Sequence, residues 1–276
     1  MKRFPRLRKE IGQRVYRALK GVGFLRSGKY FLYEARRSFL DGPERNREMV
    51  GLEYELNPDP FGISTNQEDF QKQTEMLDAV RGQSRFRRAF EIGCAEGGFT
   101  EILESRCESV LAVDLSPVAV ARASSRRLWD DRVRFRAWDL RLDPLPGAFD
   151  LIVLCGVLEL LYRPSALRSV WARLVDALDP GGCLLLQTTY ANPVVERAWW
   201  GRYFLRGKWI DAYARRHPAL EVVATQTASY CIRSLFRKRQ SAALLSAPVV
   251  HQAARALRVI NARGDSSSSP GDTQVH

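Results

Sequence analysis

Residues 88–100 read RAFEIGCAEGGFT, and this stretch decides the predicted fold. It starts with a short apolar run, Ala89–Ile92, and a helical pattern begins at Phe99, so the segment predicts a strand, a glycine-rich turn and a helix. Gly93 and Gly97 allow the backbone to turn tightly and to approach a ligand closely. The stretch therefore predicts a ligand-binding loop at the end of a buried strand.

The loop differs from a dinucleotide-binding turn in two respects. That turn reads G-x-G-x-x-G and directs a helix N-terminus at a pyrophosphate. Here Ala95 stands at the second glycine position, and Glu91 places a carboxylate at the end of the strand. A carboxylate favours a cationic ligand over a phosphate, and the sulfonium and amino groups of S-adenosylmethionine fit that requirement. For the turn alone, a purely structural role is the alternative.

Acidic residues also close the next two predicted strands. Asp114 ends an apolar run twenty-one residues after Gly93, where a carboxylate can accept hydrogen bonds from both ribose hydroxyls. Asp139 follows the next strand and is placed to meet an adenine amino group. Single aspartates at strand ends are often helix caps, so the prediction depends on the whole series in order. The predicted cofactor-binding residues are Glu91, Gly93, Cys94, Ala95, Gly97, Asp114, Leu115, Asp139, Leu140 and Cys155.

Short apolar runs and helical stretches alternate along the rest of the region, which predicts parallel pairing through right-handed crossovers. The segment 178–182, LDPGG, predicts a turn before the last parallel strand, and two later runs predict an antiparallel pair. The fold class is therefore α/β, a doubly wound, mostly parallel seven-stranded sheet of Rossmann-like type. The predicted strands are Ala89–Ile92, Val110–Val113, Val133–Ala137, Leu151–Leu154, Cys183–Gln187, Leu220–Thr227 and Cys231–Phe236. The predicted helices are Gln67–Val80, Phe99–Ser105, Pro117–Arg127 and Pro164–Leu178.

Charge separates the N-terminal segment from the rest of the chain. Of the net charge of +12 in 276 residues, residues 1–50 carry +9, from fourteen basic and five acidic side chains. We therefore predict a basic helical extension at 1–53, a cofactor-binding domain at 54–240, a C-terminal helix at 241–263 and a disordered tail at 264–276. For residues 1–50 three roles stay open: a helix packed on the domain, a contact with an anionic membrane surface, and a nucleic-acid contact.

Five cysteines without a C-x-x-C pair, four of them in or beside apolar segments, indicate free thiols in a reducing compartment. Three histidines without ligand-like spacing predict no metal site. No apolar run reaches the ~18 residues of a membrane span, and the N-terminus lacks the apolar core of a signal peptide. We therefore expect a cytoplasmic protein, with peripheral membrane association left open.

Residues 88–190 resemble class I S-adenosylmethionine-dependent methyltransferases through E-x-G-x-x-x-G, the ribose aspartate and the P-G-G-x-L-L-L run at 180–186. More narrowly, EIGCAEGGFT at 91–100 and NPDPF at 57–61 resemble the nodulation protein S family. That resemblance implies N-methylation of the free amino group of a deacetylated chito-oligosaccharide. The chain departs from the family pattern in having Phe61 for Trp, in lacking a Tyr-Glu pair near Phe70 and Gln71, and in its basic N-terminus.

Candidate substrate-site residues follow the fourth and fifth strands. Glu159 is the candidate to orient or deprotonate an acceptor, and a solvated carboxylate in a first helical turn is the alternative. Many relatives carry His where this chain has Leu160. Tyr190, Trp199 and Trp200 open an aromatic stretch beyond the carboxyl edge of the sheet, where open α/β folds bind substrates. Such aromatic side chains stack on sugars or enclose an amine, or they form a packed lid helix.

The predicted function is methyl transfer from S-adenosylmethionine to an N or O atom of a small molecule or saccharide. Two alternative functions are compatible with the same residues. One is an RNA methyltransferase, although the segment 150–155 lacks the N/D-P-P-Y tetrapeptide of many amino-directed enzymes acting on nucleic acid. The other is a protein that binds S-adenosylmethionine without catalysis.

Overall fold

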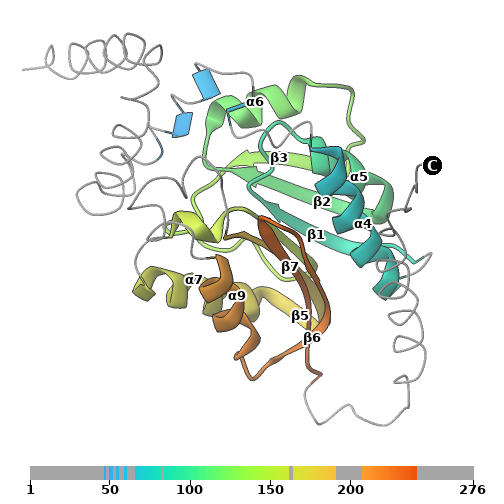
Figure 1. Cartoon of the computed structure of the whole chain (residues 1–276). Helices are drawn as coiled ribbons and strands as arrows, with labels where there is room; N and C mark the ends of the chain where they lie inside the picture. Colours follow the sequence, from blue (N-terminus) through green and yellow to red (C-terminus); the bar gives the residue numbers. More distant parts are fainter. Residues whose placement is uncertain are drawn as a thin grey trace, which may run out of the picture.

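The structure is a computed structural model that describes residues 66–81, 84–161, 164–190 and 207–240, together with 47, 50, 51, 54, 55, 59 and 60. Within these residues the chain forms one seven-stranded sheet of order β3-β2-β1-β4-β5-β7-β6 (Figure 1). The first five strands of the sequence pair in parallel, and β7 pairs antiparallel with both β5 and β6. The predicted mostly parallel, doubly wound sheet with an antiparallel pair at one edge is confirmed.

Most element boundaries lie within a few residues of the prediction. The strands are β1 Phe86–Ile92, β2 Cys107–Asp114, β3 Val133–Ala137, β4 Phe149–Cys155, β5 Leu178–Thr189, β6 Leu220–Thr227 and β7 Cys231–Lys238. The helices are α4 Gln67–Arg81, α5 Gly98–Arg106, α6 Pro117–Ser125, the 3-10 turn η2 Leu158–Leu160, α7 Pro164–Ala177 and α9 Gly207–Arg215.

The predicted turn at 178–182 is wrong, because these residues already belong to β5. Leu178 pairs with Phe149 of β4, and the register shifts before Leu151 pairs with Cys183. Gly181, with φ 77°, absorbs that irregularity, so the proline and glycines bend the strand without ending it. Helix α7 accordingly stops at Ala177, one residue earlier than predicted.

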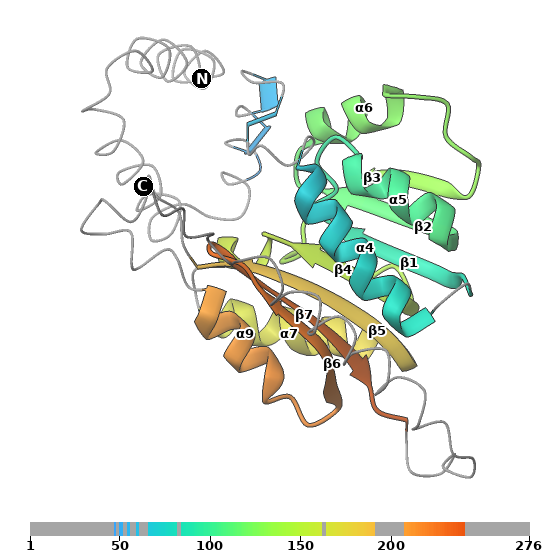
Figure 2. The ribbon, with the colours of Figure 1, turned by 45° about the vertical axis from the view of Figure 1, so that its right-hand side comes forward.

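Helices cover both faces of the sheet (Figures 1 and 2). On one face, Phe70, Leu77 and Leu103 of α4 and α5 pack against β1, β2 and β4. On the other face, α7 and α9 bury side chains such as Trp171 and Ile210 against β4, β5 and β7. Two buried faces explain why the central strands read as continuous apolar runs.

Local signals place the helix starts next to the sheet edge. Ser116 caps α6, since its hydroxyl accepts a hydrogen bond from the backbone N–H of Ala119, and Pro117 takes the first helical position. Gly97 caps α5 in the left-handed conformation. Both helices therefore begin directly above the carboxyl ends of β1 and β2.

Several predicted segments lie outside the described residues. These are the C-terminal helix 241–263, the tail 264–276 and nearly all of the basic extension 1–53. No helix in the described ranges is long and apolar enough to cross a membrane.

Candidate functional site

A cavity of about 460 Å³ opens at the carboxyl ends of β1, β2, β4 and β5. The strand order reverses between β1 and β4, and open α/β folds bind ligands in the crevice at such a point. Eight of the ten predicted cofactor-binding residues line the cavity: Glu91, Gly93, Cys94, Asp114, Leu115, Asp139, Leu140 and Cys155. The other two, Ala95 and Gly97, belong to the loop between β1 and α5 and are not among the lining residues.

The loop between β1 and α5 is fixed by the end of β2. The backbone N–H groups of Gly93 and Cys94 both donate to the carbonyl of Val113, at 2.8 and 3.0 Å. Gly93 has φ 84°, and a Cβ added there would lie 2.5 Å from Cγ2 of Val157. Ala95 also has a positive φ, 50°. The chain thus approaches the cavity with its backbone, as a close-fitting ligand requires.

Asp114 ends β2 and organises the loops on either side of it. Its carboxylate accepts hydrogen bonds from the backbone N–H groups of Ala95 at 3.0 Å and Ser116 at 2.9 Å. Burial raises the pKa of this carboxyl, and these backbone donors oppose the rise. Since each carboxylate oxygen has two lone pairs, Asp114 retains acceptor capacity for hydroxyl groups of a ligand.

Glu91 lies at the end of β1 and is 3% exposed. The hydroxyl of Thr100 donates to its Oε2 at 2.6 Å. Burial raises the pKa of Glu91 to about 7, the Thr100 hydrogen bond opposes that rise, and the charge of Asp114 adds to it. Two buried carboxyl groups at one end of the cavity make that end favourable for a cation.

An apolar wall and an ion pair form the side of the cavity beside β3. Trp138 and Leu140 are buried, and both line the cavity. Asp139, 1% exposed, accepts hydrogen bonds from Arg141 through Nε at 3.0 Å and Nη2 at 2.8 Å. The predicted contact between Asp139 and an adenine amino group therefore has to be shared with Arg141, which lines the cavity too.

Sequence reasoning missed two residues that precede α4 and close over the loop. Val50 and Tyr54 are buried, line the cavity and pack with Ala95 and Ala119. Burial, followed by the charge of Asp114, raises the pKa of Tyr54, so its phenol stays neutral. Tyr54 stands in no recognisable sequence pattern, and only its aromatic character beside the NPDPF segment offered a signal.

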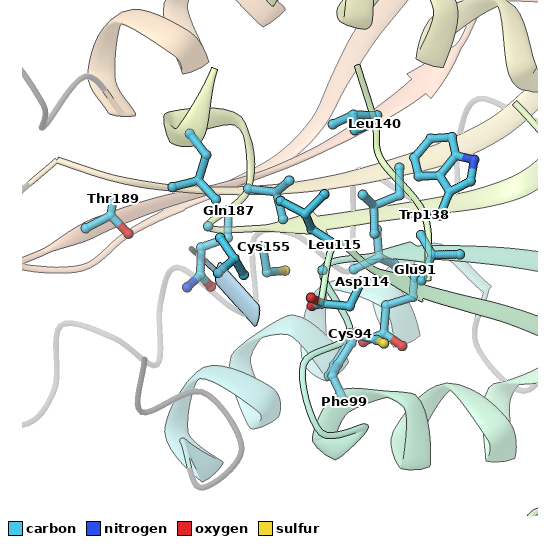
Figure 3. A pocket seen from close by; sticks show the side chains of 18 of the residues that line it. Glu91, Cys94, Phe99, Asp114, Leu115, Trp138, Leu140, Cys155, Gln187 and Thr189 are labelled. Carbon is cyan, nitrogen blue, oxygen red and sulfur yellow. The ribbon is translucent and has the colours of Figure 1, made fainter. Parts of the chain in front are cut away.

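A buried polar cluster, which the sequence also did not predict, borders the opposite end of the cavity. Cys155 lies between the two ends in Figure 3, with Gln187 and Thr189 on one side and Asp114 and Glu91 on the other. We call the buried polar cluster the α4–β7 cluster, because its hydrogen bonds join α4 to β7 across β5. Its members are Asn66, Asp69, Gln73, Gln187, Tyr230 and Arg233.

Of the predicted substrate-site residues, Glu159 and Tyr190 are described by the structure, and neither lines the cavity. Oε1 of Glu159 accepts a hydrogen bond from the backbone N–H of Thr189, and Oε2 is buried without a partner. Burial raises the pKa of Glu159 to about 7, but the residue does not line the cavity. Tyr190 donates its hydroxyl to the carbonyl of Ala228. Trp199 and Trp200 fall outside the described residues.

The aromatic stretch predicted as a ligand wall or a lid helix ends in α9. There Trp209 and Tyr213 stack with ring centroids 5.9 Å apart, while Ile210 and Ala214 enter the core. Within the part of the chain that the structure describes, no group of three or more His, Cys, Asp or Glu side chains is arranged to hold a metal ion.

Comparison with known proteins agrees with this geometry. The family model for nodulation protein S matches residues 43–225. Nodulation protein S of Sinorhizobium fredii is 32% identical over 124 residues, which cover 45% of this chain and 57% of the relative. The protein of the same name from Bradyrhizobium diazoefficiens is 29% identical over 142 residues, 51% of this chain and 68% of the relative. The chain thus spans between half and about two thirds of the length of these relatives.

Solved structures give the same assignment. The N-methyltransferase NodS from Bradyrhizobium japonicum WM9 superposes with a TM-score of 0.53 and 25% identity, covering 64% of this chain and all of that one. Its complex with S-adenosyl-L-homocysteine gives a TM-score of 0.51 and 26% identity, covering 66% of this chain and 93% of that one. The chain therefore belongs to the nodulation protein S family and has the Rossmann-like fold of its methyltransferases.

Proposed function

We propose that this chain is an S-adenosylmethionine-dependent methyltransferase that acts on an N or O atom of a small molecule or saccharide. The observation that carries the proposal is the pair of buried carboxyl groups, Glu91 and Asp114, lining one cavity at the switch point of the sheet. The similarity to the solved structures of the N-methyltransferase NodS supports nitrogen as the acceptor atom.

The residues present fit the proposed cofactor. Asp114 offers free lone pairs to the ribose hydroxyls, and Glu91 offers a negative charge to the amino group and sulfonium. Leu115, Trp138 and Leu140 form an apolar surface for a purine ring. Gly93 lines the cavity without a side chain, and a Cβ added there would clash with Val157.

When bound, S-adenosylmethionine supplies an activated methyl group: the acceptor lone pair bonds to its carbon as the carbon–sulfur pair leaves to sulfur. The protein contributes position and the exclusion of water, which suffice for much of the acceleration of such a displacement. No histidine or lysine occurs among the described residues that line the cavity. An acceptor that reacts as a neutral amine needs no base in the attack.

Glu159 is better suited to a supporting role than to proton transfer. Its carboxylate holds the backbone of Thr189, which lines the cavity. We propose that Glu159 fixes the end of β5 beside the acceptor, while the aromatic residues at 190, 199 and 200 remain candidates for acceptor binding. The free cysteines of the chain support a cytoplasmic location.

Titration of S-adenosylhomocysteine tests the proposal directly. Asp114→Ala should bind it at least about tenfold more weakly than the wild type, because hydrogen bonds to a charged group are lost. Asp114→Asn checks the fold, because the amide oxygen of asparagine can still accept a hydrogen bond from a backbone N–H. Asp78→Ala on α4 is the control, since Asp78 pairs with Arg106 at the surface. Equal affinities in wild type and Asp114→Ala would reject the ribose contact, and no binding by the wild type would reject the proposed function.

A further inference from the structure

The α4–β7 cluster is built around a buried ion pair. Asp69 of α4 and Arg233 of β7 are 6% and 2% exposed, and Arg233 donates from Nη2 to the Asp69 carboxylate. Asp69 also accepts from Asn66 at 3.0 Å, from Gln187 at 2.9 Å and from the hydroxyl of Tyr230. Arg233 offsets the charge of Asp69, which itself lines the cavity.

This ion pair fixes the orientation of Gln187. Its Nε2 donates to Asp69, and its Oε1 accepts from Nε of Arg233 at 2.8 Å. Exchanging the oxygen and nitrogen of this amide would bring two donors together and two acceptors together. The oxygen of Gln187 must therefore face Arg233 and, beside it, Gln73.

The orientation of Gln73 follows in turn. Its Nε2 donates to Oε1 of Gln187 at 2.8 Å, so its own Oε1 points the other way. Gln73 is 2% exposed and lines the cavity, and its Oε1 is buried without a hydrogen-bond partner. A buried acceptor left unsatisfied costs about 1–3 kcal/mol, so this atom is suited to receive a donor from a ligand.

We propose that Oε1 of Gln73 accepts a hydrogen bond from the methyl acceptor and thereby selects a neutral amine over a hydroxyl. This inference rests on the proposed methyltransferase function and names a specificity-determining residue for it. An amide oxygen is an acceptor but too weak a base to remove a proton. An amine can donate one N–H to it while its lone pair attacks, whereas a hydroxyl held there keeps its only proton and stays a poor nucleophile.

Position in the cavity supports the same role. Gln187, the partner of Gln73, lies across Cys155 from Glu91 and Asp114 (Figure 3), so the cluster occupies the end opposite the proposed cofactor contacts. Asp69 and Arg233 act through Gln187 as positioning residues. The three elements that contribute to the cluster, α4, β5 and β7, are all separated from one another in the sequence by other elements.

Two analogues of S-adenosylhomocysteine test the inference without knowledge of the natural acceptor. In both, nitrogen replaces the sulfur; one carries a 2-aminoethyl arm and the other a propyl arm, each extending along the path of the methyl group. Wild type should bind the aminoethyl analogue at least about tenfold more tightly than the propyl analogue. Gln73→Met, with a side chain of similar length, should remove that preference and leave the affinity for S-adenosylhomocysteine unchanged.

Gln73→Leu provides a second apolar variant, and Gln71→Met, at an exposed position of the same helix, is the matched control that should retain the preference. The inference is overturned when wild type shows no preference, or when Gln73→Met and Gln73→Leu, folded and binding S-adenosylhomocysteine, keep it. Failure of the proposed function is recognised separately, because wild type then binds neither S-adenosylhomocysteine nor either analogue.

Discussion

Replacing Glu91 with Gln should have opposite effects on stability and on ligand binding. Burial raises the pKa of Glu91 from its ordinary 4.5 to about 7. Above pH 7 the folded protein therefore carries a buried charge that the unfolded chain solvates, and a shift of this size corresponds to about 3 kcal/mol. Below about pH 4.5 the carboxyl is protonated in both states and the penalty vanishes. Glutamine is neutral at every pH and retains an acceptor for Thr100.

At pH 8, Glu91→Gln should therefore be more stable than wild type by up to about 3 kcal/mol. For a domain of this size that corresponds to roughly 6–12 °C in Tm. The gain should shrink as the pH falls from 7 towards 4.5, because wild-type Glu91 becomes protonated in the folded state over that range. Thermal melting of both proteins at a series of pH values measures the difference.

Binding should change in the other direction. The wild type should bind S-adenosylhomocysteine more weakly as the pH falls below about 7, since the carboxylate that receives the amino group takes up a proton. Glu91→Gln should bind about tenfold to hundredfold more weakly at pH 8, and this loss should diminish at low pH. Glu101→Gln, on the exposed side of α5, should alter neither quantity. Identical melting curves and affinities for Glu91→Gln and wild type at pH 8 would refute the reasoning.

Two glycines give further predictions. Gly93→Ala should destabilise the fold by about 2 kcal/mol in denaturant unfolding, since φ is 84° and the new Cβ would lie 2.5 Å from Val157. Adding Val157→Ala should recover part of the lost stability. If it recovers none, the contact with Val157 is not the source of the destabilisation. Gly207→Ala should cost about 1–3 kcal/mol by the same measurement, because its Cβ would lie 2.3 Å from the carbonyl oxygen of Thr189. Gly51→Ala, with nothing within 4 Å of the new Cβ, is the control, and an equal effect there would contradict the steric argument.

The cofactor end of the cavity was predictable because its residues follow strands directly. Parallel strands bring their carboxyl ends to one edge, so Glu91 and Asp114 had to lie near each other once the alternation of strands and helices was recognised. The turn at 178–182 misled the prediction, since Pro and Gly usually interrupt a strand. In this fold the irregular pairing of β4 with β5 accommodates them.

The opposite end of the cavity could not be predicted in the same way. Asn66 and Asp69 read as ordinary residues of a helix start, and Arg233 reads as one of many basic residues. They meet because of the angle at which α4 lies across β5 and β7, which no spacing in the sequence encodes. The Asp69–Arg233 pair joins residues 164 positions apart.

That separation has a consequence for synthesis. The strand that supplies Arg233 is inserted between β5 and β6 and is the last of the seven to be translated. A nascent chain that has exposed only β1 to β5 still lacks the guanidinium that pairs with Asp69 in the complete fold. Domains generally fold as units during synthesis, and here the cavity can be completed only after β7 has emerged from the ribosome, so the first five strands alone do not make the binding site.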